Sequence, residues 1–243
     1  MVWRPGETGF LWGCSGTVKA DFFSQVPRDL GRNLRYRIEL RKRAQGDAGF
    51  RRAMLTACKH DILFFFAAWC WLYEPRPRKT EDGITLPNII PFIPWDHQIP
   101  VIREIDEHLG FRDIGMEKSR GEGASWIAVL FSLHRWLFRQ MSAIGLVSRT
   151  ENAVDNPDDP DSLMWKLDWE LEQLPRWMGG VKDKEYKRTL SDHTLKNLRN
   201  GSTITGYAAT GDVASGGRKL FFLADELAKF PRGPDREAMA STQ

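Results

Sequence analysis

The sequence predicts an α/β fold in which helices flank a parallel β-sheet and a helical N-terminal lobe precedes it. The main observation is a strand–helix–strand pattern: an apolar stretch at Phe111–Met116, a helical period from about Ala124 to Arg139, and a second apolar strand at Ala143–Ser148. A further buried-strand pattern follows at Lys219–Ala224. A helix between two strands is the usual connection in a parallel sheet, because parallel neighbours cannot be joined by a tight turn.

The N-terminal lobe is expected to be helical after an irregular start. Residues 1–26 are Gly-rich without periodicity and predict a loosely held arm. A basic helix is expected from Pro27 to about Gln45, and a second helix from about Ala48 to Tyr73. The second helix ends in the apolar run Ile62–Tyr73, whose twelve residues are too few to cross a bilayer and are typical of a buried helix.

A linker separates this lobe from the rest of the chain. Pro75, Pro77 and the polar stretch Lys79–Gly83 interrupt all periodicity. We therefore predict two parts, an arm and helical lobe at residues 1–78 and the main α/β domain at residues 79–243.

The main domain begins with an extended segment, Ile89–Trp95, because residues before proline avoid the helical region. Asp96 is expected to cap the next helix, which carries Gln98 and apolar residues up to Leu109. Residues 152–161 are a turn.

A helix is then predicted from Ser162 to about Leu174, where Pro175 stops it. Two short β patterns, Thr194–Leu198 and Ser202–Tyr207, flank Asn200-Gly201 and predict a hairpin.

Charge is distributed unevenly, although the net charge is only +3. Residues 28–52 hold nine Lys and Arg against three acids, and residues 151–172 hold eight acids against one Lys. Each run fits a solvated helix face, and the basic run also fits a surface that touches a phosphate backbone. The three cysteines show no paired or metal-type spacing, which indicates a reducing cytosol.

The stretch Glu117–Trp126, between the first strand and its helix, has the composition of a phosphate-binding loop. Glycines let the backbone approach a phosphate, and free N–H groups converge at the start of a helix. Gly123 and Ser125 match the usual pattern, but Ala124 stands at the position of the usual lysine. Lys118 or Arg120, at the start of the loop, can replace that lysine, and Ser125 is the natural Mg²⁺ ligand.

Asp225-Glu226, directly after the last apolar strand, has the composition of the second half of such a site. One carboxylate at the end of a strand holds Mg²⁺, and the next one polarises the attacking water. Alone, the loop also fits a plain turn, and the acidic pair also fits a helix cap. Together they predict a P-loop NTPase fold of the ASCE, or RecA-like, type that binds ATP and Mg²⁺.

Several stretches resemble the large terminase subunits of tailed bacteriophages and prophages. Glu117–Trp126 resembles their deviant Walker A motif, in which the lysine is shifted to the start of the loop. Pro94–Gln98 resembles their adenine-recognising segment, and Ser148–Glu151 resembles the segment after their second strand. Asn200–Gly206 and Gly216–Glu226 resemble their run into the Walker B motif. The similarity covers roughly residues 85–243.

The resemblance implies a role for each matching residue. Gln98 would read the adenine edge, Asp225 would hold Mg²⁺ together with Ser125, and Glu226 would activate water. Arg218 matches the position of an arginine finger offered to a neighbour's ATP; a salt bridge or a DNA contact is the other reading, and Arg149 is a weaker candidate for the same task. The residues implied to bind the triphosphate are those of the loop: Lys118, Ser119, Arg120, Gly121, Glu122, Gly123, Ala124 and Ser125. Lys118 is the expected catalytic cation among them.

The function implied by the resemblance is that of the ATPase portion of a viral DNA-packaging motor, which moves double-stranded DNA into a procapsid. Its implied partners are DNA, a homo-oligomeric ring, the procapsid portal and a small terminase subunit, in the host cytoplasm and not at a membrane.

The family also has a coupling strand and a nuclease domain, which we do not find in these residues. We therefore expect a fragment with an incomplete sheet and no nuclease activity. A helicase-like, nucleic-acid-stimulated ATPase and a non-hydrolysing nucleotide- or DNA-binding module are the alternatives.

Overall fold

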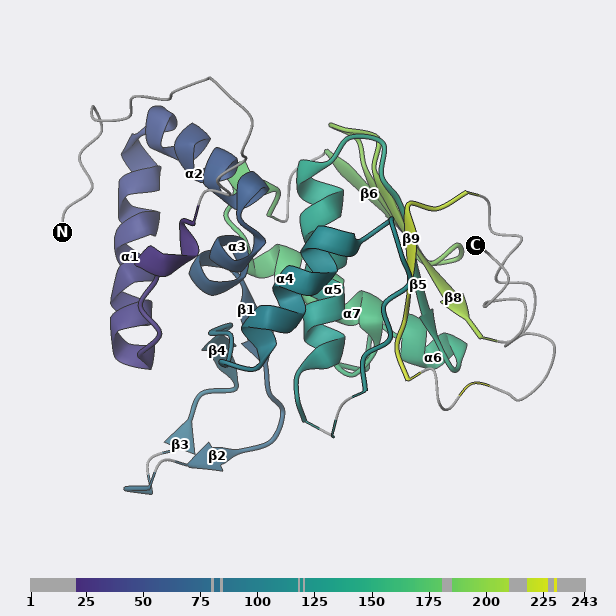
Figure 1. Ribbon diagram of the computed structural model, residues 1–243, viewed down its shortest axis with the longest axis horizontal. Coiled ribbons are helices and arrows are strands. Elements are labelled where there is room, and N and C mark those ends of the chain that lie inside the picture. The colour runs from purple at the N-terminus through teal and green to yellow at the C-terminus, as the bar shows by residue number, and fades with distance from the viewer. Residues whose placement is uncertain are drawn as a thin grey trace.

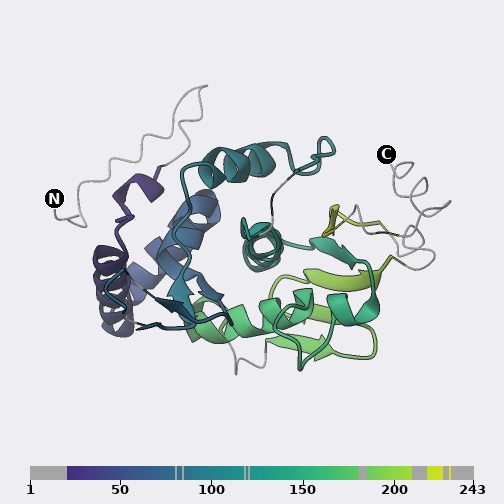
Figure 2. The same ribbon diagram turned by 90° about the horizontal axis from the view of Figure 1, so that it is seen from below.

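The computed structural model describes residues 21–79, 81–83, 85–117, 119, 121–180, 185–209, 218–226 and 230 of the 243-residue chain. Within these residues the protein is a mixed α/β structure. A group of N-terminal helices lies on one side of a central helix, α5, and a β-sheet lies on its other side (Figures 1 and 2). The predicted α/β class with a helix-flanked sheet agrees with this structure, but the predicted parallel sheet is wrong in part, because the sheet contains antiparallel as well as parallel strands. The division into residues 1–78 and 79–243 stays a prediction.

The N-terminal group contains three helices, each preceded by an aspartate that caps it. They are α1 (Leu30–Gly46), α2 (Ala48–His60) and α3 (Ile62–Trp69), and a 3₁₀ turn, η1 (Phe23–Gln25), precedes them. The single helix predicted over residues 48–73 is wrong, because Asp61 breaks it. The Asp61 carboxylate accepts hydrogen bonds from the N–H groups of Phe64 at 3.0 Å and Phe23 at 2.8 Å. Residues 1–20 of the predicted arm lie outside the described residues, and Phe23 is buried.

Short strands connect this group to the next helix. β1 (Trp71–Tyr73) pairs antiparallel with β4 (Ile89–Pro91), and β2 (Arg78–Lys79) pairs with β3 (Thr85–Leu86). The segment Ile89–Trp95 is extended at its start, as predicted. Helix α4 (Gln98–His108) follows, but its N-cap is His97 and not Asp96. Asp96 instead forms an ion pair with Arg28, with 2.5 Å between Nη1 and Oδ1.

The sheet has five strands in the order β6-β7-β8-β5-β9. They are β5 (Ala143–Ser148), β6 (Tyr186–Thr189), β7 (Thr194–Asn197), β8 (Thr203–Ala208) and β9 (Phe221–Ala224). β8, β5 and β9 are parallel, whereas β6, β7 and β8 are antiparallel. The predicted hairpin across Asn200-Gly201 is confirmed as β7–β8, and β6 is a strand that the sequence patterns did not predict.

The strand predicted at Phe111–Met116 is wrong. The segment is an irregular loop after α4, and the Phe111 side chain is 87% exposed. The N–H groups of Phe111 and Arg112 both bond to the carbonyl of His108, which continues the end of α4 as a turn. Apolar residues form a strand only where a neighbouring strand can pair with them, and no described strand pairs with this segment.

The core is built around α5 (Ala124–Phe138), most of whose residues are buried. α3 packs on it from the N-terminal group of helices, and α7 (Leu163–Gln173) and β8 pack on it from the later part of the chain. The short helices α6 (Glu151–Val154) and η2 (Arg176–Met178) flank α7. The turn predicted over residues 152–161 is therefore wrong at its start, where α6 continues to Val154 from its N-cap Thr150. No helix within the described ranges is long and apolar enough to span a membrane.

A buried carboxylate on α7 connects this helix to the segment that follows the N-terminal helices. Glu170 is fully buried, and its oxygens accept from the Trp71 N–H at 3.0 and 3.2 Å. Arg37 stacks over the Trp71 ring at 4.8 Å and is also buried. Burial raises the pKa of Glu170 well above its ordinary value, while the Trp71 N–H and the charge of Arg37 oppose this shift.

Removing this carboxylate is expected to destabilise the fold strongly. Glu170→Ala leaves the buried Trp71 N–H without its acceptor and removes the carboxyl group whose charge acts on buried Arg37, and an unsatisfied buried donor alone typically costs about 1–3 kcal/mol. Urea unfolding at neutral pH measures this loss. The control is Glu172→Ala, which removes an exposed carboxylate from the same helix and should change little. A Glu170→Ala variant as stable as that control would contradict this role.

Candidate nucleotide site

The candidate site lies where the N-terminus of α5 meets the carboxyl end of β9. The Ser125 hydroxyl donates a hydrogen bond to Asp225 Oδ2 at 2.5 Å, across 100 residues of chain. Ser125 stands in the first turn of α5, and Asp225 directly follows β9. Two residues that the motifs selected independently are therefore in direct contact.

Among the described residues, no capping side chain bonds to the backbone N–H groups at the start of α5. Its N-cap is Gly123, which provides no capping side chain and has a left-handed backbone with φ of 69°. Gly121 is also left-handed, with φ of 90°, a conformation that glycine adopts without strain. The first N–H groups of a helix have no acceptor within the helix, and they carry its positive dipole end. This arrangement is able to bind an anion.

Gln98 supports this loop from α4. Its side-chain Oε1 accepts from the Trp95 N–H at 2.9 Å, and its Nε2 donates to the Glu122 carbonyl at 2.9 Å. A Cβ at position 123 would lie 3.3 Å from Gln98 Nε2, so glycine allows the close approach. The amide keeps one further donor and one further acceptor site. In this structure, Gln98 positions the loop.

The side chain of Glu122 turns away from Ser125 toward α4. Its carboxylate lies 2.8 Å from His97 Nε2 and accepts from the Ser119 hydroxyl at 3.0 Å. These residues border a pocket of about 350 Å³, a volume within the range of small-molecule sites. Its lining contains both apolar and polar residues: Val101, Met116, Ala124 and Ile127, with His97, Gln98, Glu117, Ser119 and Glu122.

Glu226 lies beside Asp225 in a strained conformation. Its backbone is left-handed with φ of 57°, which is unusual for a residue other than glycine. Its N–H donates to Asp225 Oδ1 at 3.0 Å, and its Oε2 lies 3.6 Å from Arg149 Nε. Arg149 follows β5, the neighbour of β9, so adjacent parallel strands deliver both charges to one edge of the sheet.

Arg218 is not at this edge. It precedes β9, whereas Asp225 follows it, so seven residues of largely extended chain, or about 20 Å, separate the two. Arg218 is exposed there. Lys118 and Arg120 lie outside the described residues, and so do Gly216 and Gly217.

Lys166 is a charged neighbour of the site that the sequence patterns did not identify. It lies on α7, is buried, and donates from Nζ to the Asp161 carbonyl at 2.5 Å. Burial lowers the pKa of Lys166 below its ordinary value, and the carboxylates of Asp161, Asp225 and Asp159 oppose this shift. The signal in the sequence was a charge on the apolar stripe of α7, four residues before buried Glu170.

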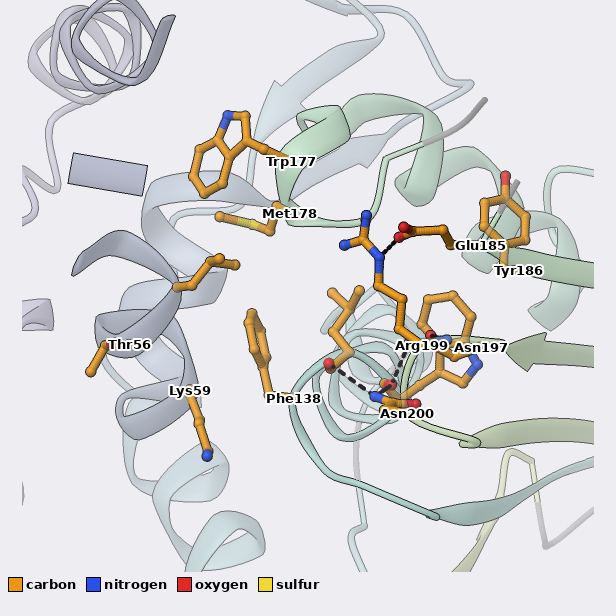
Figure 3. A pocket seen from close by; sticks show the side chains of 14 residues that line it. Thr56, Lys59, Phe138, Trp177, Met178, Glu185, Tyr186, Asn197, Arg199 and Asn200 are labelled. Carbon is orange, nitrogen blue, oxygen red and sulfur yellow. Dashed lines mark hydrogen bonds and ion pairs between the residues drawn. The ribbon is translucent and has the colours of Figure 1, made fainter. Parts of the chain in front are cut away.

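A second pocket, of about 310 Å³, lies at the other end of α5 (Figure 3). Phe138, Trp177 and Met178 contribute apolar walls. Asn200 donates to the carbonyls of Trp136 at 2.9 Å and Leu137 at 3.2 Å, which closes the end of the helix. This pocket lies about 20 Å from Ser125, given the rise of an α-helix, and is separate from the candidate site.

If Gln98 positions the loop, a change that keeps its size but removes its donor should loosen the loop. Gln98→Glu removes the hydrogen bond to the Glu122 carbonyl and places two acceptors face to face, which is expected to cost about 1–3 kcal/mol. Thermal and urea unfolding measure the loss, and Gln45→Glu, on an exposed position of α1, is the control. Equal stability of both variants would contradict the role of the Gln98 hydrogen bonds in positioning the loop.

In comparisons with known proteins, the chain matches no protein-family model and no curated protein sequence. The assignment of a function therefore depends on the residues and their geometry.

Proposed function

We propose that this chain binds and hydrolyses Mg-ATP as the ATPase portion of a DNA-packaging motor of the terminase type. The observation that carries the proposal is the contact between Ser125 and Asp225. A hydroxyl and a carboxylate at this distance offer two hard oxygen ligands to one cation, which is the chemistry that Mg²⁺ requires. Bound Mg²⁺ would neutralise phosphate charge next to the start of α5.

The triphosphate would lie over the N-terminus of α5. The left-handed glycines 121 and 123 and the uncapped N–H groups support this placement. A P-loop fold of the ASCE type, with this loop as a deviant Walker A motif, is part of the proposal. The positively charged side chain of the loop would be that of Lys118 or Arg120, as the sequence motif predicts. The pocket beside Gln98, with its apolar wall of Val101 and Ile127, would hold the base.

Glu226 is the proposed general base. It follows the proposed Mg²⁺ ligand Asp225 directly, so water bound near the cation would be within its reach. Arg149 Nε lies 3.6 Å from its Oε2 and can hold the carboxylate in place at this edge of the sheet.

Arg218 is proposed to act on a neighbouring subunit's nucleotide. Its position before β9, about 20 Å from Asp225, is unsuitable for its own site and compatible with donation in trans. That role implies a homo-oligomeric ring. From the family resemblance we also propose the partners: double-stranded DNA, the procapsid portal and a small terminase subunit. The proposed location is the host cytoplasm.

The cation site can be tested through nucleotide binding. Ser125→Ala and Asp225→Asn each remove one proposed oxygen ligand, and each should weaken Mg²⁺-dependent ATP binding by about tenfold or more. Titration with a fluorescent ATP analogue, with and without Mg²⁺, measures the effect. Ser132→Ala, which removes a hydroxyl that donates to the Ala128 carbonyl of the same helix, is the matched control. Unchanged affinity in both site variants would reject the site.

If Ser125 and Asp225 bind the cation and Glu226 acts only as the base, a change at Glu226 should affect turnover but not binding. Glu226→Gln is expected to retain Mg-ATP binding while turnover falls by about 10²–10⁴-fold, the usual contribution of a general base. Phosphate release under saturating ATP measures turnover. Binding without turnover in the wild-type chain would favour the non-hydrolysing alternative. Turnover by Lys118→Ala at the wild-type rate would exclude the relocated lysine.

A further inference from the structure

One face of the sheet is polar and positively charged. Two rows of residues cross its antiparallel half, one through the pairs Lys187–Lys196 and Lys196–Thr203, the other through Thr189–Thr194 and Thr194–Thr205. We call these six residues the lysine–threonine face. Between the rows lie Arg188, Leu195 and Ile204, whose side chains are on the other face. Leu195 and Ile204 are fully buried there, where α5 packs, and Arg188 is ion-paired with Asp155 and Asp168. The alternation of a strand therefore places the lysines and threonines of the antiparallel half together on one face.

Within the described residues, no ion pair balances the two lysines of this face. Lys187 and Lys196 are direct partners across the antiparallel pair, and both are exposed. Like charges at opposed positions destabilise a sheet. The nearest carboxylate along β6, that of Glu185, is ion-paired with Arg199 (Figure 3).

Other strand residues on this face add no negative charge. By register they are Ala143, Gly145, Val147, Tyr207, Phe222 and Ala224, and none of them is acidic. Lys219 extends the positive charge, with its Nζ 5.4 Å from the centre of the Tyr207 ring. An anionic partner would relieve the repulsion that the described residues leave in place.

We propose that the lysine–threonine face docks on the phosphate backbone of double-stranded DNA. Lysine ammonium groups and threonine hydroxyls are both common donors to phosphate oxygens, and two adjacent rows offer several of them together. Tyr207, the aromatic residue on this side of β8, packs against Phe222 at 6.0 Å with Lys219 over it, so its ring is not free to stack on a base. Single strands are usually held by such stacking, which favours a duplex as the partner.

The choice of DNA over RNA rests on the proposed function as a motor on DNA. The charge and geometry of the face stand independently of the nucleotide site.

The salt dependence of DNA binding tests the proposal. Fluorescence anisotropy with a labelled DNA duplex gives the slope of log affinity against log salt concentration for the full chain. Lys187→Gln combined with Lys196→Gln is expected to reduce that slope by about 1.8, since each phosphate contact contributes about 0.9. Lys59→Gln combined with Lys79→Gln removes the same charge from exposed positions elsewhere and should leave the slope unchanged.

The stability of the double variant separates a binding defect from a folding defect. Removal of the opposed charges should leave the melting temperature unchanged or raise it. A slope equal to that of the wild-type chain, or an equal fall in the control variant, would overturn the docking face. Tighter binding of a single strand of the same sequence, with the same sensitivity to the two lysines, would overturn the choice of a duplex.

Mg-ATP binding, measured on the same samples, distinguishes this proposal from the proposed function. Retained nucleotide binding with a reduced salt slope supports both. Absent nucleotide binding in the wild-type chain, together with a reduced slope in the double variant, would reject the ATPase and retain the DNA-docking face.

Discussion

The burial of α5 is the constraint on which most of the molecule depends. Its residues are apolar around most of its circumference, so it is stable only where other elements cover it on several sides. α3, α7 and β8 do so. Burial also fixes both ends of the helix. The first turn brings Ser125 against Asp225, and the last turn leaves carbonyls that Asn200 satisfies. The packing of α5 therefore positions both the candidate site and the β7–β8 hairpin.

Helix α7 connects this central helix to the charged groups of the interior. Lys166 and Glu170 lie on its buried side, four residues apart. Glu170 accepts a hydrogen bond from the Trp71 backbone, close to Arg37, and so ties α7 to the N-terminal helices. Lys166 lies within electrostatic reach of Asp225. Charged residues at apolar positions are costly, and each of these has specific partners that offset part of the cost.

The two faces of the sheet differ in the residues that they carry. The face under α5 carries the apolar residues that join the core, such as Leu146, Leu195 and Ile204. The opposite face carries the lysines and threonines of its antiparallel half. Over the parallel half, Val147, Tyr207 and Phe222 belong to a smaller apolar cluster. Because strand residues alternate, a shift of one register position would exchange these faces and lose the core.

Local patterns were sufficient for α1, α5, β5 and the β7–β8 hairpin, because helical period, apolar runs and the Asn200-Gly201 turn act within a few residues. They also selected Ser125 and Asp225, since each motif is local. Other features depend on partners that are distant in the chain. The helix breaks at Asp61, whose carboxylate accepts from the N–H of Phe23, and segment 111–116 forms no strand because no described strand pairs with it. Gln98 acts through the loop at Glu122, and Lys166 through the carboxylate of Asp225. The order of strands brings Ser125 and Asp225 into contact across 100 residues, and strand order follows from the packing of the whole sheet, which no local pattern encodes.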